Sequence, residues 1–499
     1  MPSNNGIWKV ITASSVGTLI EWYDFYIFGS LSTIISQKFF PDVNPTAALL
    51  STLATFAAGF IVRPFGALFF GRLGDIIGRK YTFLLTLILM GGSTFLIGCV
   101  PTYAVIGGWA PFLILVLRLL QGLALGGEYG GAATYVAEYA PPNRRGFYTS
   151  WIQTTATLGL FISLGVILSI RRIVGVEEFT TGNGWRYPFL LSIILVVVSI
   201  FIRLKMKESP LFSKLKKEGK TTTNPLRESF GKKENFKMVL LALFGATMGQ
   251  GVIWYTGQFY AQNFILTKCN VDYEQANVII LIALLIATPF FVIFGALSDK
   301  WGRKYIMMTG MLLGVLFYRP IFQQLYHIAD TSIKTESFSQ SETHTEKDAL
   351  HTDNKTPTEV MIVSKKYTDG TVYKYTKKTN KGLGATKSNE KKEVLLSEEA
   401  KWKMIGLIAV MVLFVTMVYG PIAAFLVELF PIRIRYTSMS LPYHIGNGVF
   451  GGLVPFVATL ITTLPGSNHL SGLWYPIGIA ILSFIIGVLY LPNKQKAYE

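Results

Sequence analysis

Apolar residues fall into about twelve long runs, which are separated by short polar stretches. The runs lie near residues 9–34, 49–70, 81–100, 110–136, 150–171, 187–205, 238–264, 276–297, 305–325, 402–428, 437–463 and 472–491. At about 1.5 Å per helical residue, a run of roughly 20 residues crosses a hydrocarbon layer of about 30 Å. The pattern predicts an all-α polytopic membrane protein with 12 transmembrane helices.

Composition and charge agree with this prediction. Of 499 residues, 51% are hydrophobic and 15% are charged, and the formal net charge is +17. The basic residues lie between the apolar runs rather than on a soluble domain, which argues against a nucleic-acid partner. Most fall in alternate loops, so the positive-inside rule predicts that both termini are cytoplasmic. The two cysteines, Cys99 and Cys269, lack metal-ligand spacing, and no metal site is expected.

A ten-residue motif occurs twice. GRLGDIIGRK at 71–80 returns as GALSDKWGRK at 295–304, with six apolar runs from one copy to the next. An even number places both copies on the same side of the membrane. The chain is therefore expected to hold two six-helix parallel-repeat halves, 1–205 and 237–499, joined by a basic cytoplasmic linker over 206–236.

One polar segment, 326–401, interrupts the second half between the ninth and tenth runs. Within it VSKKYTDGTVYKYTKK alternates on both sides of Asp369-Gly370, which predicts a two-residue turn in a β-hairpin. We expect a periplasmic insert with a small hairpin flanked by mobile chain, and Ser397 as N-cap of the following helix. Two interpretations stay open, a tolerated insertion and a surface for a partner.

Charged residues inside the apolar runs are costly and usually functional. Glu21 and Asp24 lie three residues apart, on one face of a helix, and Glu128 lies among glycines in the fourth run. Burial and a second nearby carboxylate both favour the protonated form, so these residues are candidates for carrying a proton. The alternative is structural, because Glu21 or Glu128 could pair permanently with an arginine such as Arg63 or Arg118.

Six segments together resemble the major facilitator superfamily, and within it the metabolite:proton symporter family of proline/betaine, shikimate and α-ketoglutarate-type carriers. The segments are EWYDF at 21–25, the stretch from Gly59 to Lys80, RLLQG at 118–122, GGEYGGA at 126–132, ESPLF at 208–212 and ELFPIRIRYTS at 428–438. The resemblance covers the chain apart from 326–401. It implies a major facilitator fold, alternating access and, for Arg118 with Gln121, a part in proton coupling. The competing interpretation of Arg118 is a fixed ion pair in helix packing.

The repeated loop motif is expected to form a cytoplasmic gate. In the resembled family such a network holds the outward-facing state and breaks when the cavity opens inward. Its expected members here are Asp75, Arg79, Lys80, Glu138, Arg145, Glu208, Asp299, Arg303, Lys304, Glu428 and Arg435. The competing interpretation is topology alone, since basic loop residues orient a membrane protein without any role in gating.

The substrate site is expected near the midplane, where the halves meet. Polar and aromatic residues at suitable depth are Tyr23, Tyr26, Arg63, Gln121, Gln153, Trp254, Tyr255, Gln258, Gln262, Tyr443, His444 and Asn447. Aromatic residues in helices often only pack, whereas a histidine between Pro442 and Gly446 inside a span needs water, substrate or a carboxylate. Arginines that face the cavity would favour a substrate with a carboxylate.

The sequence thus predicts a secondary active transporter that couples protons to a small carboxylated or zwitterionic metabolite. Alternatives are a sugar or polyol porter of the same superfamily and a non-transporting membrane receptor that uses the outer insert. No enzyme motif is present, and protons are the only expected cofactor. We expect a monomer in the bacterial inner membrane, in contact with lipid and a small-molecule substrate.

Overall fold

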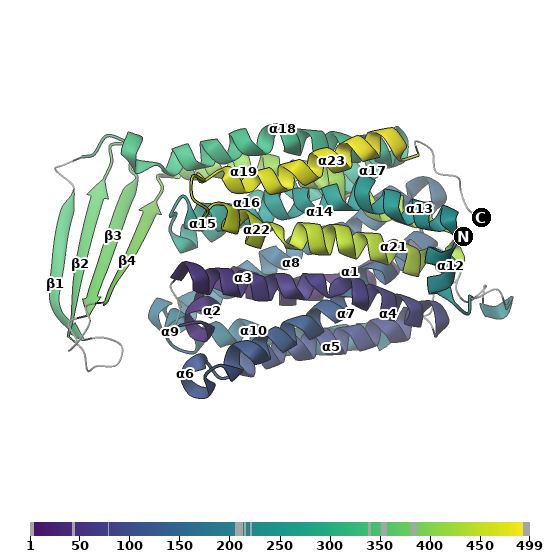
Figure 1. Cartoon of the computed structure of the whole chain (residues 1–499), viewed down its shortest axis with the longest axis horizontal. Helices are drawn as coiled ribbons and strands as arrows, with labels where there is room; N and C mark the ends of the chain where they lie inside the picture. Colours follow the sequence, from purple (N-terminus) through teal and green to yellow (C-terminus); the bar gives the residue numbers. More distant parts are fainter. Residues whose placement is uncertain are drawn as a thin grey trace.

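The computed structural model describes residues 4–41, 45–77, 79–204, 213, 216–219, 222–337, 341–350, 357–380 and 387–492. It shows an elongated helical bundle with a β-sheet at one end (Figure 1). Helix α1 begins and helix α23 ends at the opposite end of the bundle. We call these the sheet end and the terminal end.

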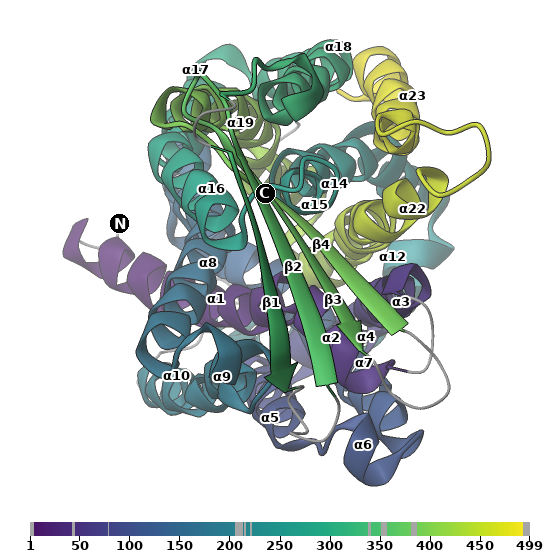
Figure 2. The same cartoon turned by 90° about the vertical axis from the view of Figure 1, so that its left-hand side faces the viewer.

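Two groups of helices lie side by side along the bundle (Figures 1 and 2). The first group contains α1 (Asn4–Ser30), α2 (Ser32–Phe39), α3 (Pro45–Ile61), α4 (Arg63–Ile76), α5 (Arg79–Cys99), α6 (Tyr103–Ile106), α7 (Trp109–Tyr139), α8 (Arg145–Val174), α9 (Val176–Thr180) and α10 (Tyr187–Leu204). The second contains α13 (Lys233–Ala242), α14 (Met248–Tyr255), α15 (Ala261–Thr267), α16 (Tyr273–Ala287), α17 (Pro289–Trp301), α18 (Arg303–Ala329), α19 (Glu398–Tyr419), α20 (Ile422–Leu429), α21 (Arg435–Tyr443), α22 (Val454–Ile461) and α23 (Trp474–Tyr490). Helix α12 (Pro225–Gly231) lies in the predicted linker.

Several predicted spans are made of two helices that meet at a proline. Helix α4 has Pro64 in its first turn, α17 begins at Pro289, and Pro421 separates α19 from α20. Proline lacks the N–H that a helix interior needs, so each of these spans is interrupted at or beside its proline. Among the described residues nine segments are long and apolar enough to span a membrane, and two more apolar helices are shorter. The count of twelve stays a prediction.

Packing joins the two groups into one body. Helix α17 packs against α8, and α21 packs against α4 and α7. A continuous apolar core runs through both groups. On the sides of the bundle large apolar side chains are exposed, among them Phe65, Phe69, Ile194, Leu285 and Leu489. So much exposed apolar surface suits a hydrocarbon surrounding rather than water.

The insert forms a four-stranded antiparallel sheet in the order β1-β2-β3-β4. Its strands are β1 (Glu342–Leu350), β2 (Pro357–Lys366), β3 (Val372–Asn380) and β4 (Lys387–Leu395). The sequence predicted one hairpin with mobile flanks. It did not predict the outer strands, because ETHTEKDAL and KSNEKKEVL lack the apolar alternation that reveals a half-buried strand.

The connection between β2 and β3 is longer than the predicted two-residue turn. Lys366 pairs with Val372, so the chain reverses over Tyr367 to Thr371, with Gly370 at φ +85°. The Asp369 carboxylate accepts hydrogen bonds from the Thr371 N–H at 2.9 Å and the Lys334 ammonium at 2.7 Å, which fixes this wider turn. The predicted cap of the next helix is confirmed, since Ser397 Oγ accepts from the Ala400 N–H at 3.3 Å.

Candidate functional site

Aromatic side chains from both groups meet around Arg63 near the middle of the bundle. Trp22 and Tyr26 of α1 lie 5.3 and 5.9 Å, centroid to centroid, from the Trp254 ring of α14. The Tyr255 ring lies 5.3 Å from that of Phe60. We call this region, with the polar side chains described below, the central layer. It joins the two groups of helices.

Arg63 is buried in this layer at the start of α4. Its guanidinium lies 4.2 Å from the centroid of the Phe60 ring and 5.8 Å from that of Trp22. A Cβ added at Gly448 in the second group would lie 3.2 Å from Arg63 Cδ, so the arginine reaches across to that group. Aromatic faces attract a cation, so these rings help to hold the guanidinium between the two groups. This placement suits an arginine that receives an anionic group.

A chain of hydrogen bonds and ring contacts crosses the central layer from α8 to α21. Gln153 Nε2 donates to Tyr129 Oη at 2.6 Å, and the Tyr129 ring stacks on Tyr443 with centroids 3.6 Å apart. The Tyr443 hydroxyl is 2.7 Å from the Tyr419 hydroxyl and accepts from Asn447 Nδ2 at 3.1 Å. The stacked rings of Tyr129 and Tyr443 join the two groups, and hydrogen bonds within each group hold the two rings in place.

Other polar groups of the layer have no such contacts. Both ring nitrogens of His444 and both amide atoms of Gln258 are buried and meet no hydrogen-bond partner in the described part of the chain. They lie in the π-helical segments His444–Gly451 and Thr256–Tyr260. Such segments often mark functional positions, and a buried polar group without a partner is costly. The arrangement leaves polar atoms available for a ligand or water.

Asp24 is fully buried in the first group, and neither of its carboxylate oxygens makes a hydrogen bond that meets normal geometric criteria within the described residues. The Thr94 hydroxyl is a near neighbour. Thr94 Oγ1 accepts from Gln121 Nε2 at 2.5 Å, and Gln121 Oε1 accepts from Arg118 Nη1 at 2.7 Å. A polar path thus leads from Arg118 towards Asp24, whose charge is not balanced by a direct ion pair among the described side chains.

The other two candidate carboxylates differ from Asp24. Glu128 is buried and accepts from the Thr86 hydroxyl at 3.4 Å. Glu21 belongs to α1, but its side chain lies outside the described residues.

Three predicted substrate residues make their hydrogen bonds within one group of helices. The Tyr23 hydroxyl donates to the Pro188 carbonyl at 3.2 Å within the first group, and Gln121 belongs to the path described above. Gln262 Nε2 donates to Asn277 Oδ1 at 2.8 Å within the second group. These hydrogen bonds hold the three side chains within their own group and do not join the two groups.

Sequence reasoning missed several members of the central layer, namely Trp22, Phe60, Tyr129, Gln250 and Tyr419. Gln250 Nε2 donates to Asn447 Oδ1 at 3.4 Å. One signal was available in the sequence, because Gln250 lies eight residues before Gln258, about two helical turns away on the same side of a helix. The tyrosines had no such signal, since their partners are distant in the chain.

Ion pairs and helix ends meet at the terminal end. Asp299 accepts from the Gly146 and Phe147 N–H groups at 2.8 and 2.9 Å, and its Oδ1 is 3.0 Å from Arg303 Nη1. Arg303 also donates twice to the Glu428 carboxylate, at 2.7 and 2.6 Å. A carboxylate at the N-terminus of α8 is stabilised by the free N–H groups there. We call the group formed by Asp299, Arg303 and Glu428 the latch.

The first copy of the motif makes the matching contact. Asp75 at the end of α4 accepts from the Thr437 hydroxyl at 2.6 Å and from its N–H at 3.3 Å, near the start of α21. Each repeated aspartate therefore binds the first turn of a helix in the opposite group.

The remaining predicted gate residues have varied places. Arg145 lies 3.9 Å from Glu428, whereas Lys304 donates to the carbonyls of Val488 and Leu491 at 2.9 and 2.8 Å. Arg435 Nε donates to the Phe430 carbonyl at 3.2 Å. Glu138 is partly buried near the end of α7, while Glu208 and the side chains of Arg79 and Lys80 lie outside the described residues.

Comparison with known proteins adds a family to this geometry. The family described as sugar (and other) transporters matches residues 9–337. The proline/betaine transporter of Salmonella typhimurium LT2 is 36% identical over 314 residues, 61% of this chain and 62% of that relative, so the match spans less than two thirds of it. The α-ketoglutarate permease of Escherichia coli K12 is 29% identical over 491 residues, 98% of this chain and 94% of that relative.

A likeness to a solved structure concerns the fold alone. The proton:xylose symporter XylE, bound to 6-bromo-6-deoxy-D-glucose, superimposes with a TM-score of 0.70 at 16% identity, covering 99% of this chain and 98% of that one.

Proposed function

Because the chain belongs to the major facilitator superfamily, in the family of sugar and other transporters, we propose that it is a proton-coupled symporter for a small carboxylated or zwitterionic metabolite. It works by alternating access, with the substrate held in the central layer between the two groups of helices.

Arg63 carries the substrate proposal. It is a buried cation at the junction of the two groups, set against the rings of Phe60 and Trp22. An arginine offers paired N–H donors that match a carboxylate, and the interaction is strongest where water is excluded. The relatives named above for proline, betaine and α-ketoglutarate take compounds that all carry a carboxylate, which supports the same class here.

Asp24 is the proposed proton carrier. A carboxylate that is fully buried without a direct cation partner among the described residues is costly when charged. Protonation removes this cost and lets the two groups rearrange with the substrate bound. The hydrogen bonds from Arg118 through Gln121 to Thr94 lie beside the Asp24 carboxylate and would rearrange when its charge changes.

The latch supports alternating access. Asp299, Arg303 and Glu428 join α8, α17, α18 and α20 at the terminal end, and Asp75 joins α4 to α21. Opening that end requires these contacts to break together. We place the terminal end in the cytoplasm of a bacterial cell and the protein in the inner membrane, as a monomer that uses protons and no other cofactor.

The test is uptake into proteoliposomes under an imposed inward proton gradient. Three pools are compared, namely carboxylates, zwitterions and sugars with polyols. The proposal expects accumulation from a carboxylate or zwitterion pool that collapses when an ionophore removes the gradient.

Accumulation from the sugar pool alone would replace the substrate class with a sugar or polyol. Binding without uptake from any pool would favour a receptor, the remaining alternative.

A further inference from the structure

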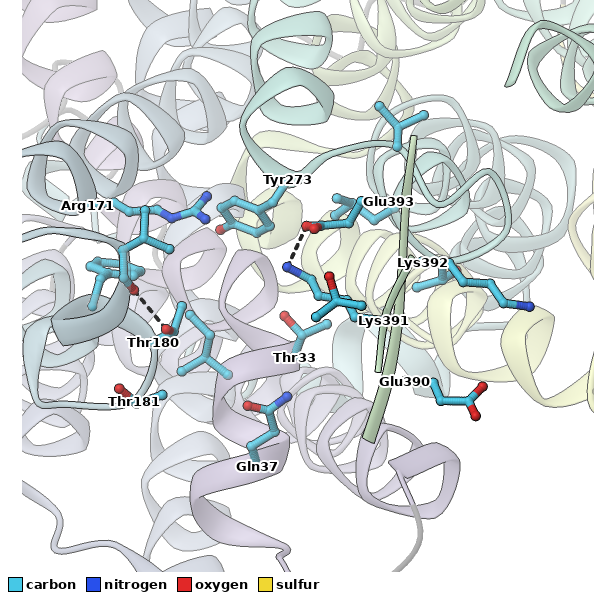
Figure 3. Close-up of a pocket in the computed structure, with 17 residues that line it drawn as sticks. Thr33, Gln37, Arg171, Thr180, Thr181, Tyr273, Glu390, Lys391, Lys392 and Glu393 are labelled. Carbon is cyan, nitrogen blue, oxygen red and sulfur yellow. Dashed lines mark hydrogen bonds and ion pairs between the residues drawn. The ribbon is translucent and has the colours of Figure 1, made fainter. Parts of the chain in front are cut away.

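A cavity of about 530 Å³ lies at the sheet end, between the two groups and beneath the insert (Figure 3). The first group lines it with α2, the end of α8 and α9, and the second group lines it with α15 and the start of α16. The insert provides a further wall through residues 390–393 of β4 and Thr376 of β3. Its volume is that of a small-molecule site.

The strand is fixed to one side of this cavity. Val394 donates its N–H to the Asn270 carbonyl at 2.7 Å, and its carbonyl accepts from Asp272 at 2.9 Å. Leu396 and Gln275 exchange two hydrogen bonds of 2.7 and 2.9 Å. From this attachment on the second group the sheet extends across the end of the bundle and over the first group (Figure 2). The insert therefore forms a wall that the helices alone would leave open.

Arg171 is the most informative residue of the cavity. It is 8% exposed, and its Nε and Nη1 atoms meet no hydrogen-bond acceptor among the described residues. Glu274 Oε1 lies 3.9 Å from Nη1, an ion pair too long for a hydrogen bond, and the Tyr273 ring lies 4.7 Å from the guanidinium. A buried guanidinium with unused donors favours an anionic oxygen ligand.

The charges on the facing strand are mostly balanced. Lys391 Nζ pairs with Glu393 at 2.5 Å, and Lys391, Lys392 and Glu390 are all exposed. Figure 3 shows the Lys391 ammonium directed into the cavity, on the side of β4 that faces Thr33. A ligand carboxylate would thus find the Arg171 guanidinium on one wall and the ion pair of Lys391 with Glu393 opposite.

We propose that this cavity is a binding site for small carboxylates, separate from the central layer, in which Arg171 holds the carboxylate and β4 of the insert covers it. The proposal rests on the proposed function for its ligand class only. Since β4 is attached to the second group and Arg171 belongs to the first, the site is complete only when the two groups are close at this end. In this arrangement the insert retains substrate at the entrance between the two groups, at the sheet end.

The test is a local one that does not require transport. Gln37 lines the cavity and is exposed, so a Gln37→Cys substitution in a Cys99→Ala background places a thiol there. Cys269, the other cysteine, is buried. A charged, membrane-impermeant thiol reagent is applied to purified protein in nanodiscs, and the rate of modification is measured with and without succinate.

Succinate is expected to slow modification, and dimethyl succinate or sodium chloride of equal ionic strength is not. The Arg171→Gln variant should weaken this protection about tenfold or more, because a charge-assisted contact is lost. Lys391→Gln should weaken it about threefold, as expected for a partly exposed ion pair, without risk to the fold. The matched controls, Arg172→Gln beside Arg171 and Lys366→Gln on the sheet, are exposed and should leave protection unchanged.

Several results would overturn the site. Equal protection by the uncharged ester or by chloride would show crowding or screening instead of carboxylate binding, and so would full protection in both Arg171→Gln and Lys391→Gln. No protection by succinate at any concentration would also reject it. Loss of protection in Arg63→Gln would mean that the effect originates in the central layer. Protection in a protein that transports no carboxylate would leave this site standing while the proposed function fails.

Discussion

Two buried aspartates show opposite environments. Asp299 in the latch accepts from two backbone N–H groups and faces Arg303, so each oxygen of its carboxylate has a partner. Asp24 is more deeply buried, yet neither of its carboxylate oxygens makes a hydrogen bond within the described residues. The same contrast separates the latch as a whole from the part of the central layer around His444 and Gln258.

The contrast indicates a division of labour. A satisfied carboxylate stabilises the conformation in which its partners meet, so the latch holds the terminal end closed. An unsatisfied buried polar group destabilises the empty protein unless a proton, water or ligand reaches it. Under the proposed function, the latch stabilises the closed conformation, and the central layer trades some stability for the ability to bind substrate.

The largest effect is expected at Arg63. Arg63→Gln removes the buried charge that is proposed to hold the substrate carboxylate, so the half-saturation concentration for uptake should rise roughly a hundredfold, the equivalent of about 3 kcal/mol. Arg72→Gln is the control, because Arg72 is exposed near the end of the same helix. Similar uptake kinetics in the two variants would remove Arg63 from the site.

The second effect tests the latch. Asp299→Asn removes a charged acceptor from three donors, which should shift the closed state by roughly 2 kcal/mol, or about 30-fold in population. A thiol placed by Ser150→Cys, where α8 packs against Gly295, should then react much faster from the terminal end. In the control Asp272→Asn the cap of α16 is retained, since Asn is an equally good N-cap. An unchanged rate in Asp299→Asn would reject the gate.

Two further variants compare a buried polar group that lacks hydrogen bonds with one that makes them. Gln258→Met replaces unsatisfied amide atoms with an apolar side chain of similar size, so the thermal midpoint should rise while uptake falls. Tyr443→Phe breaks hydrogen bonds with Tyr419 and Asn447, which should lower stability by about 1–3 kcal/mol. Thermal unfolding in nanodiscs measures both. A lower midpoint for Gln258→Met would mean that its amide is satisfied in the membrane.

The smallest effect concerns the turn of the insert. Partial burial alone would raise the pKa of Asp369, but the Lys334 ammonium and the Thr371 N–H and hydroxyl hold that pKa below its usual value. The charged carboxylate therefore stabilises the turn above about pH 4, and this contribution is lost as the pH falls through the lowered pKa. Since Asp369 is partly exposed, about 0–1 kcal/mol is expected.

Hydrogen exchange of the Gly370 amide, which donates to the Tyr367 carbonyl, measures this loss between neutral and acidic pH. Asp369→Asn should abolish the dependence on pH. An equal dependence in that variant would assign it to another group.

Sequence alone predicted features that a local pattern or an internal repeat reveals. The duplicated motif identified Asp75 and Asp299, and the turn residues around Gly370 located the centre of the insert. The sequence could not reveal that the Tyr23 hydroxyl binds the Pro188 carbonyl, because tertiary packing decides which side of a helix meets the second group. The π-helical segments at Gln258 and His444, which turn these side chains away from a regular helical register, have no clear sequence signal either.

The most direct test compares two modes of transport in Asp24→Asn. Proteoliposomes are loaded with the substrate found in the uptake screen, and exchange without a gradient is measured beside accumulation driven by an inward proton gradient. If Asp24 carries the proton, the neutral variant should still exchange substrate but lose accumulation. Proton-driven accumulation at the native level in Asp24→Asn would contradict the proposed coupling.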